Sequence, residues 1–368
     1  MRQAASRPAE ERGLSRDAVR MLIATPDGLA HASFRDLPRY LAPGDLLVVN
    51  TSATLAAAVD GHRADGRPVT VHFSTPLDDG IWLVELRTRP PEPVRVRDGE
   101  PGERVLLPAG VSVTLLGRYP DPQADRLWRA ATATGARDPA AYLAAHGRPI
   151  RYSYVPGRWP LSAYQTVFSR DPGSAEMPSA GRPFTPELVT DLVAAGVVIA
   201  PITLHAGVAS LEAGEQPLPE RFTVPEPTAA LVNLARAAGR RVVAVGTTVT
   251  RALESAVEAG SAGGGPPFRA GGPFLAGEHS IAVASARADW KVRGRSGWTD
   301  LVLGAQHPAR VVTGLITGWH DPEASHLALL EAVAGPALVR AAYAEAEREG
   351  YLGHEFGDSC LLLPPLSR

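Results

Sequence analysis

The pattern of apolar residues in this chain changes near residue 140, and that change constrains the fold more than any other feature. Before it, short strand-like runs alternate with Asp-Gly, Pro and Gly turns, a spacing typical of a small antiparallel barrel or sandwich. The runs are PVTVHF, IWLVELRT, ERVLLP, VSVTLLG and DRLWRAAT. After residue 140, apolar strands alternate with helical segments, which favours an α/β layer with parallel strands. Two architectures are therefore predicted in one chain.

The later segment contains clear helix and strand signals. Thr185 is the expected N-cap and Pro186 the first residue of a helix, ELVTDLVAA. The elements expected after it are strand VVIAPITL, helix TAALVNLARAAG, strand RRVVAVG and helix VTRALESAVEAG. We expect residues 1–60 and 141–368 to form an α/β main domain, barrel-like or layered, with residues 61–140 inserted as a small antiparallel β-barrel domain.

Composition excludes several classes of protein. The net charge of −2 gives no electrostatic footprint for nucleic acid, and Lys291 is the only lysine. A single cysteine, Cys360, excludes a disulfide framework and a thiolate metal cluster within one chain. No apolar run approaches the roughly 18 residues of a membrane span, and the N-terminus lacks the apolar region of a signal peptide. We therefore expect a cytoplasmic protein that does not contact a membrane.

A strand-to-helix turn lies at Gly246, Thr247 and Thr248, within VAVGTTVTRALES. The free N–H groups and dipole of a helix N-terminus attract an anion such as a carboxylate or phosphate. Arg251 and Glu254, on the first turns of that helix, would face the same pocket. The alternative is a capped turn with a surface Arg and Glu.

Histidines follow two predicted strands. His205 ends PITLHAG, and His320 follows VVTGLIT in TGWHDPEASHL. The carboxyl ends of strands are where α/β folds bind ligands, and imidazole transfers protons near neutral pH. A structural histidine is the alternative at both positions, and His326, inside the next helix, is expected to be a packing residue. There is no GxSxG, HExxH, P-loop or GxGxxG motif.

Taken in order, eight segments resemble the S-adenosylmethionine:tRNA ribosyltransferase-isomerase family of queuosine biosynthesis. VGTTVTRALES is close to the family's form, and the order of the segments is equally specific. The segments are RDAVRML, FRDLPRYLAPGDLLVVN, YQTVFS, PSAGRPFTPEL, TLHAG, VAVGTTVTRALESA, ITGWHDPEAS and FGDSCLL. The resemblance therefore spans nearly the whole chain.

The resemblance implies an enzyme that uses S-adenosylmethionine as a ribosyl donor, with no metal and no second cofactor. The family passes the ribosyl unit to the aminomethyl group of a deazaguanine base in tRNA and rearranges it to an epoxycyclopentane, while adenine and methionine leave. His205 and His320 would transfer protons. The residues expected to bind the donor are Pro178, Ser179, Ala180, Gly181, Gly246, Thr247, Thr248, Arg251 and Glu254.

The chain departs from the family's pattern at three places that bear on the acceptor. Where the family reads NDTRVIPARL, residues 50–59 lack the Asp and both Arg; the histidine of APTAGLHFT is Pro183, and the lysine of FHLPKSTL is Glu323. The alternatives to tRNA are therefore a small-molecule acceptor or a nucleoside-binding protein without this activity. Binding to tRNA needs phosphate contacts. The candidates for them are Arg148, Arg151, Arg182 and Arg221.

Overall fold

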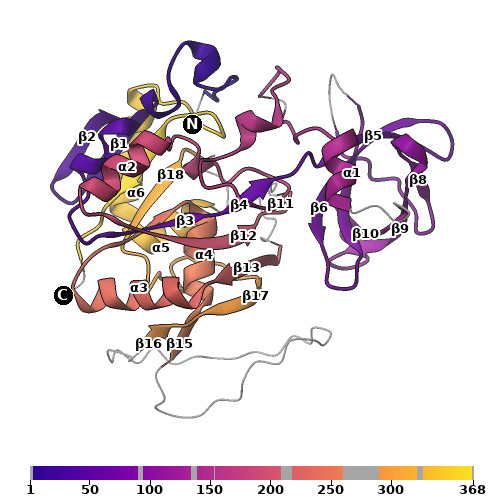
Figure 1. Ribbon diagram of the computed structural model, residues 1–368. Coiled ribbons are helices and arrows are strands. Elements are labelled where there is room, and N and C mark those ends of the chain that lie inside the picture. Colours follow the sequence, from indigo (N-terminus) through magenta and orange to yellow (C-terminus); the bar gives the residue numbers. More distant parts are fainter. Residues whose placement is uncertain are drawn as a thin grey trace.

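The computed structural model describes residues 3–89, 94–133, 139–152, 154–208, 218–259, 290–320 and 326–366. Within these residues the main domain is built on a mixed nine-stranded sheet, with the insertion beside it (Figure 1). The strands in spatial order are β17 (Arg295–Thr299), β13 (Glu220–Val224), β12 (Val198–His205), β3 (Leu46–Asn50), β14 (Val242–Val245), β18 (Gly314–Gly318), β19 (Ser359–Leu362), β1 (Arg20–Thr25) and β2 (Gly28–Ser33). The four central strands, β12 to β18, are parallel.

The two faces of this sheet are covered by different helices. Leu46 and Val48 of β3 pack into a core with α3 (Glu226–Ala237), α4 (Thr247–Ser255), α5 (His326–Ala334) and α6 (Pro336–Arg348). Leu47 and Val49 point to the other face, toward α2 (Pro186–Ala194) and the 3-10 helix η3 (Phe34–Arg39). This alternation follows from the two-residue period of a strand. The main domain is therefore layered, which decides between the two forms that the sequence left open.

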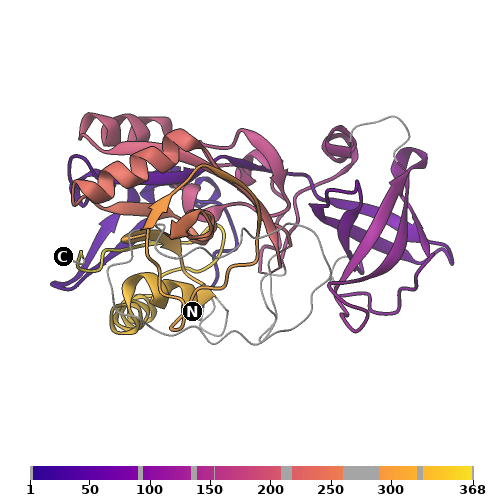
Figure 2. The same ribbon diagram turned by 90° about the horizontal axis from the view of Figure 1, so that it is seen from below.

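Residues between the first and later parts of the main domain form a closed antiparallel barrel. Its strands in spatial order are β10 (Leu127–Ala133), β7 (Trp82–Arg87), β6 (Pro68–Pro76), β5 (Ala58–Arg63), β8 (Arg104–Leu106) and β9 (Ser112–Tyr119). Figure 2 shows the barrel as a separate lobe. The fold class is thus confirmed, and α1 (Pro139–His146) lies beside the barrel. The domain boundaries at residues 61 and 140 stay predictions.

Most local signals were read correctly, with one correction. The Thr185 hydroxyl accepts a hydrogen bond from the Leu188 N–H at 3.1 Å, so it is the N-cap of α2. The helix expected to continue to Gly260 instead ends at Ser255. Val257–Ala259 form strand β15, paired with β16 (Trp290–Val292), so a partner distant in sequence overrides the helical pattern. A second small pair joins β4 (Ser52–Thr54) to β11 (Asp171–Ser174).

No helix in the described part of the chain is both long and apolar enough to span a membrane.

Candidate active site

A cavity of about 360 Å3 lies beyond the carboxyl ends of β12, β14 and β18. Its walls come from the segments after these strands, from η6 (Ser179–Gly181), and from the loop before β19. Ser74 and Thr75 of barrel strand β6 also line it, so both domains contribute. The volume falls within the range of small-molecule sites, and the position is the one that open α/β sheets use for ligands.

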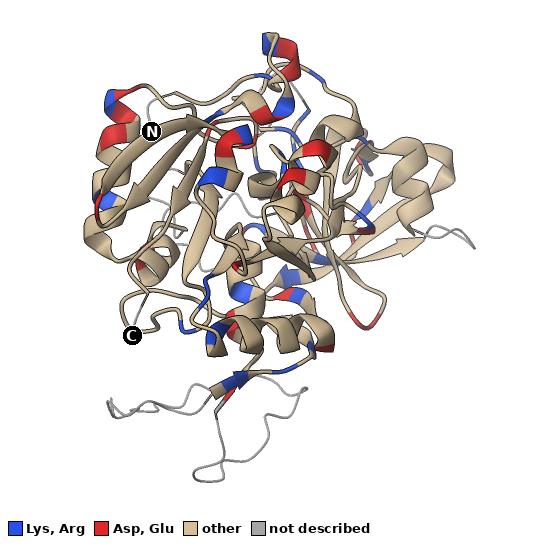
Figure 3. Ribbon diagram, turned by 60° about the vertical axis from the view of Figure 1, so that its left-hand side comes forward, with Lys and Arg blue, Asp and Glu red and all other residues tan. Residues whose placement is uncertain are grey.

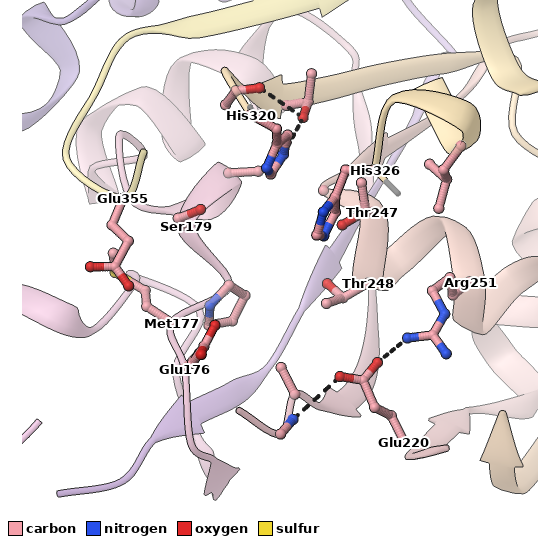
Figure 4. A pocket seen from close by; sticks show the side chains of 18 of the residues that line it. Glu176, Met177, Ser179, Glu220, Thr247, Thr248, Arg251, His320, His326 and Glu355 are labelled. Atoms are coloured by element: carbon pink, nitrogen blue, oxygen red, sulfur yellow. Dashed lines mark hydrogen bonds and ion pairs between the residues drawn. The ribbon is translucent and has the colours of Figure 1, made fainter. Parts of the chain in front are cut away.

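The turn before α4 brings two of the sequence motifs together. Gly246 has φ +94°, and a Cβ there would lie 3.3 Å from the Cβ of Ala180. The backbone angle therefore favours glycine strongly, and the close approach of η6 adds to that preference. Pro178, Ser179, Ala180, Gly246, Thr247 and Thr248 all line the cavity. The N-terminus of α4 opens into it, as Figure 4 shows for the two threonines.

Arg251 lines the cavity, but its charge is already paired inside the protein (Figure 4). Its guanidinium forms a buried ion pair with Glu220 of β13. It also donates to the carbonyls of Thr299 and Leu301, each at 3.1 Å. Burial raises the pKa of Glu220, and the Arg251 charge and the Gly207 N–H offset part of that rise. The pair therefore joins α4 to β13 and β17, a role that the sequence did not predict.

Glu254 does not face the cavity, contrary to expectation. Its carboxylate accepts the backbone N–H groups of Arg310, Val311 and Val312 at 2.9 to 3.1 Å. Burial raises the pKa of Glu254, and these three N–H groups oppose that rise. Glu254 thus holds the segment before β18 against α4. Gly181 is likewise absent from the cavity wall, although it belongs to η6.

His205 lies behind the cavity wall. Its neighbours Ala206 and Gly207 line the cavity, whereas its own ring packs against Gly173. Its Nδ1 lies 2.7 Å from the Ser52 hydroxyl, which is 2.6 Å from the Ser174 hydroxyl. This network connects β12 to β4 and β11. The alternative of a structural histidine therefore fits His205 better than a proton-transfer role.

His320 lines the cavity, and so does His326, which the sequence assigned to packing (Figure 4). The two rings are stacked, with centroids 4.5 Å apart and planes inclined by 3°. Burial lowers the pKa of His320 well below its ordinary value, and His326 and His354 add to the effect. Burial also lowers the pKa of His326, with a smaller contribution from Arg251. Both imidazoles are therefore neutral at pH 7.

The loop between α6 and β19 supplies two further cavity residues, His354 and Glu355, which sequence reasoning missed. The His354 ring stacks on Tyr154 with centroids 4.1 Å apart, and Tyr154 stacks on Tyr152. Burial raises the pKa of Glu355 to about 8, with a contribution from Glu176. These residues directly precede the FGDSCLL motif, which begins at Phe356, but nothing in their spacing marked them as functional.

The arginines expected to contact tRNA differ in accessibility. Arg182 is only 3% exposed and pairs with Glu10 at 2.9 Å, so it is not available to a phosphate. Arg148 pairs with Asp60, and Arg221 pairs with Asp78. Arg151 donates to the carbonyl of Gly157 at 3.3 Å. Figure 3 shows cationic and anionic residues interspersed, in keeping with these pairs.

Among the residues that the structure describes, no group of three His, Cys, Asp or Glu side chains is arranged to hold a metal ion. The metal-free chemistry expected from the sequence stays a prediction. Glu323 and its neighbours 321–325 lie outside the described residues.

Comparisons of this chain with a family profile and with curated proteins point to the same family. Residues 1–362 match the sequence profile of the family described as queuosine biosynthesis protein. The S-adenosylmethionine:tRNA ribosyltransferase-isomerase of Acidiphilium cryptum is 35% identical, over 97% of this chain and 95% of that protein. The protein of the same name from Moorella thermoacetica is 33% identical, over 98% and 96%. The crystal structure of S-adenosylmethionine tRNA ribosyltransferase from Thermotoga maritima matches with a TM-score of 0.47 and 25% identity, covering 98% of this chain and 96% of that one. The profile match and the two curated relatives confirm the resemblance seen in the sequence: this chain belongs to the queuosine biosynthesis family.

Proposed function

We propose that this protein is an S-adenosylmethionine-dependent ribosyltransferase-isomerase that modifies an aminomethyl-deazaguanine base in tRNA. One observation carries the proposal: the cavity is lined by residues 178–180, 246–248 and 317–320, which come from three family segments far apart in sequence. The names of the relatives support the donor and the acceptor alike. A tRNA-modifying activity places the protein in the cytoplasm.

The N-terminus of α4 holds the carboxylate of the donor's methionine. The N–H groups of Thr247 and Thr248 have no helical partner, and the helix dipole adds to their attraction for an anion. Arg251 contributes indirectly, because each of its three guanidinium nitrogens already donates to a protein group, which is Glu220, Thr299 or Leu301. Backbone from Pro178 to Ala180 approaches the nucleoside, since small residues there leave room for a flat ring.

His320 and His326 are the groups that accept a proton from the donor. The sulfonium acidifies the neighbouring 5′ C–H, so a neutral base placed beside it starts the rearrangement. Both rings are neutral at pH 7 because burial lowers the pKa of each. The Thr317 hydroxyl lies 3.3 Å from His320 Nε2 and orients that ring. His326 stands where the family segment FHLPKSTL has leucine.

The test is a turnover assay with S-adenosylmethionine and tRNA that carries the aminomethyl-deazaguanine base. We expect adenine and methionine to be released together, with an equal amount of epoxy-modified nucleoside. Unmodified tRNA serves as the control. Unchanged donor in the presence of the modified tRNA would overturn the proposed activity, whereas no heat of binding at millimolar S-adenosylmethionine would overturn the donor site.

A further inference from the structure

Two carboxyl groups that line the cavity, Glu355 and Glu176, have no role in the donor site described above. Glu355 comes from the loop before β19, and Glu176 from the segment after β11. Figure 4 shows them on one side of the cavity, with Thr247, Thr248 and Arg251 on the other. Glu176 is close enough to raise the pKa of Glu355. Because the pKa of Glu355 is raised, a cation that enters beside these two carboxyl groups would favour the ionised form of Glu355.

Glu355 lacks a partner for a buried oxygen. Its Oε2 atom is inaccessible to solvent, and no hydrogen-bond donor in the described part of the chain reaches it. The cation that acts on it electrostatically, Arg182, is already paired with Glu10 and donates to the Ala163 carbonyl. Buried polar atoms in folded proteins are almost always satisfied. Glu355 is therefore prepared for a donor that the protein itself does not provide.

The surroundings of Glu355 suit a flat aromatic ring that carries an aminomethyl group. Tyr152, Tyr154 and His354 form a stack of rings beside it, with centroid separations of 5.7 and 4.1 Å. The buried Tyr152 hydroxyl also has no hydrogen-bond partner in the described residues. His354 has φ +67°, a left-handed conformation that costs a non-glycine residue energy. Such strain beside a cavity is typical of a functional position.

We propose that Glu355, assisted by Glu176, binds the ammonium group of the acceptor's aminomethyl substituent and removes a proton from it. In this step an N–H bond of the ammonium breaks and an O–H bond forms on the Glu355 carboxylate, which leaves a neutral amine with its lone pair free. The inference rests on the proposed function, and it names the residues that select the acceptor. The methionine part of the donor also carries an ammonium group. That group is next to the methionine carboxylate, which the N-terminus of α4 holds on the side of the cavity opposite Glu355.

The test measures binding of two bases by calorimetry to the full chain saturated with S-adenosylhomocysteine, an unreactive stand-in for the donor. One base is aminomethyl-deazaguanine, and the other carries a nitrile in place of the aminomethyl group. We expect the wild-type protein to prefer the amine by about tenfold to a hundredfold, because a charge-assisted hydrogen bond is lost with the nitrile. Glu355→Gln keeps the size of the side chain and should abolish the preference. Glu176→Gln should reduce it.

Glu349→Gln, an exposed position at the end of α6, is the matched control and should retain the preference. Equal affinity of the wild-type protein for the two bases, or no affinity for either, would overturn the proposal without any variant. A second result would also overturn it: Glu355→Gln keeps the amine preference but weakens S-adenosylmethionine binding tenfold. Glu355 and Glu176 would then bind the donor and not the acceptor. If the protein prefers the amine but shows no turnover in the tRNA assay, the role of Glu355 and Glu176 is supported and only the proposed activity is contradicted.

Discussion

His320 and His326 stack face to face across the cavity wall, with ring planes inclined by only 3°. One ring follows β18 and the other begins α5, so the two are six residues apart in sequence and in contact in space. Two imidazolium ions cannot share this position, because each would repel the other in a buried environment. The pair therefore carries at most one positive charge at a time.

Replacing either histidine should remove most of the activity. We expect His320→Ala and His326→Ala each to lower kcat by a factor on the order of a hundred, the usual contribution of a general acid or base. His307→Ala, at an exposed position, is the control. Steady-state assays check this, and full activity in both cavity variants would exclude the pair from proton transfer. We expect His205→Ala to reduce thermal stability more than kcat, since His205 lies in the Ser52 network.

Acid should destabilise the protein through His320. Its folded-state pKa lies well below 6.5, so the unfolded state binds more protons between those two values. Stability therefore rises with pH through this interval and is lost as pH falls from about 6.5 toward the folded-state pKa. Denaturant unfolding of wild type and His320→Asn between pH 5 and 7.5 should show a smaller pH dependence in the variant.

Glu355 should have the opposite effect on stability. Its pKa rises from 4.5 to about 8 on folding, so the folded state binds more protons between these values. Stability falls as pH rises through that window, by at most about 5 kcal/mol, since each pKa unit corresponds to about 1.36 kcal/mol. Glu355→Gln should be more stable than wild type at pH 8 and lose most of this slope. An unchanged slope would contradict the burial of this carboxyl, and Glu349→Gln serves as the control.

Alanine variants of two glycines that precede helices can distinguish the effect of backbone strain from an effect on donor binding. Gly246 precedes α4 with φ +94° and ψ 163°, and Gly335 precedes α6 with φ +80° and ψ 149°. Alanine at either position should cost roughly 1–3 kcal/mol of stability. A Cβ at Gly246 also meets Ala180, whereas nothing lies within 4 Å at Gly335. Calorimetry should therefore find weaker S-adenosylmethionine binding only for Gly246→Ala.

Breaking the Arg251–Glu220 ion pair should lower the free energy of unfolding of the protein. Arg251→Met leaves Glu220 buried without its cation, and removing one partner of such a pair costs about 3–5 kcal/mol. The double variant with Glu220→Leu should recover part of that loss, because no charge is then stranded. Urea unfolding measures both. A double variant that is less stable than Arg251→Met alone would contradict this account of the pair.

Much of the architecture is determined by sequence alone because its signals are local. The alternating runs from Pro68 to Ala133 specify barrel strands, and Thr185 and Pro186 start a helix through contacts within one turn. Gly246 has a positive φ, which residues with a side chain avoid. A glycine between an apolar strand and a helical pattern therefore predicts the turn before α4. Family segments likewise identify part of the cavity wall in advance.

The tertiary structure decided which charged and titratable side chains face the cavity. Arg251 and Glu254 are three residues apart, yet one lines the cavity and the other binds backbone N–H groups near β18. His205 is enclosed by β4 and β11, while His326 and Glu355 are brought to the cavity by elements at the far end of the chain. Each outcome depends on a partner more than 30 residues away or on packing between layers. Local periodicity carries no information about such partners, so only the folded chain reveals them.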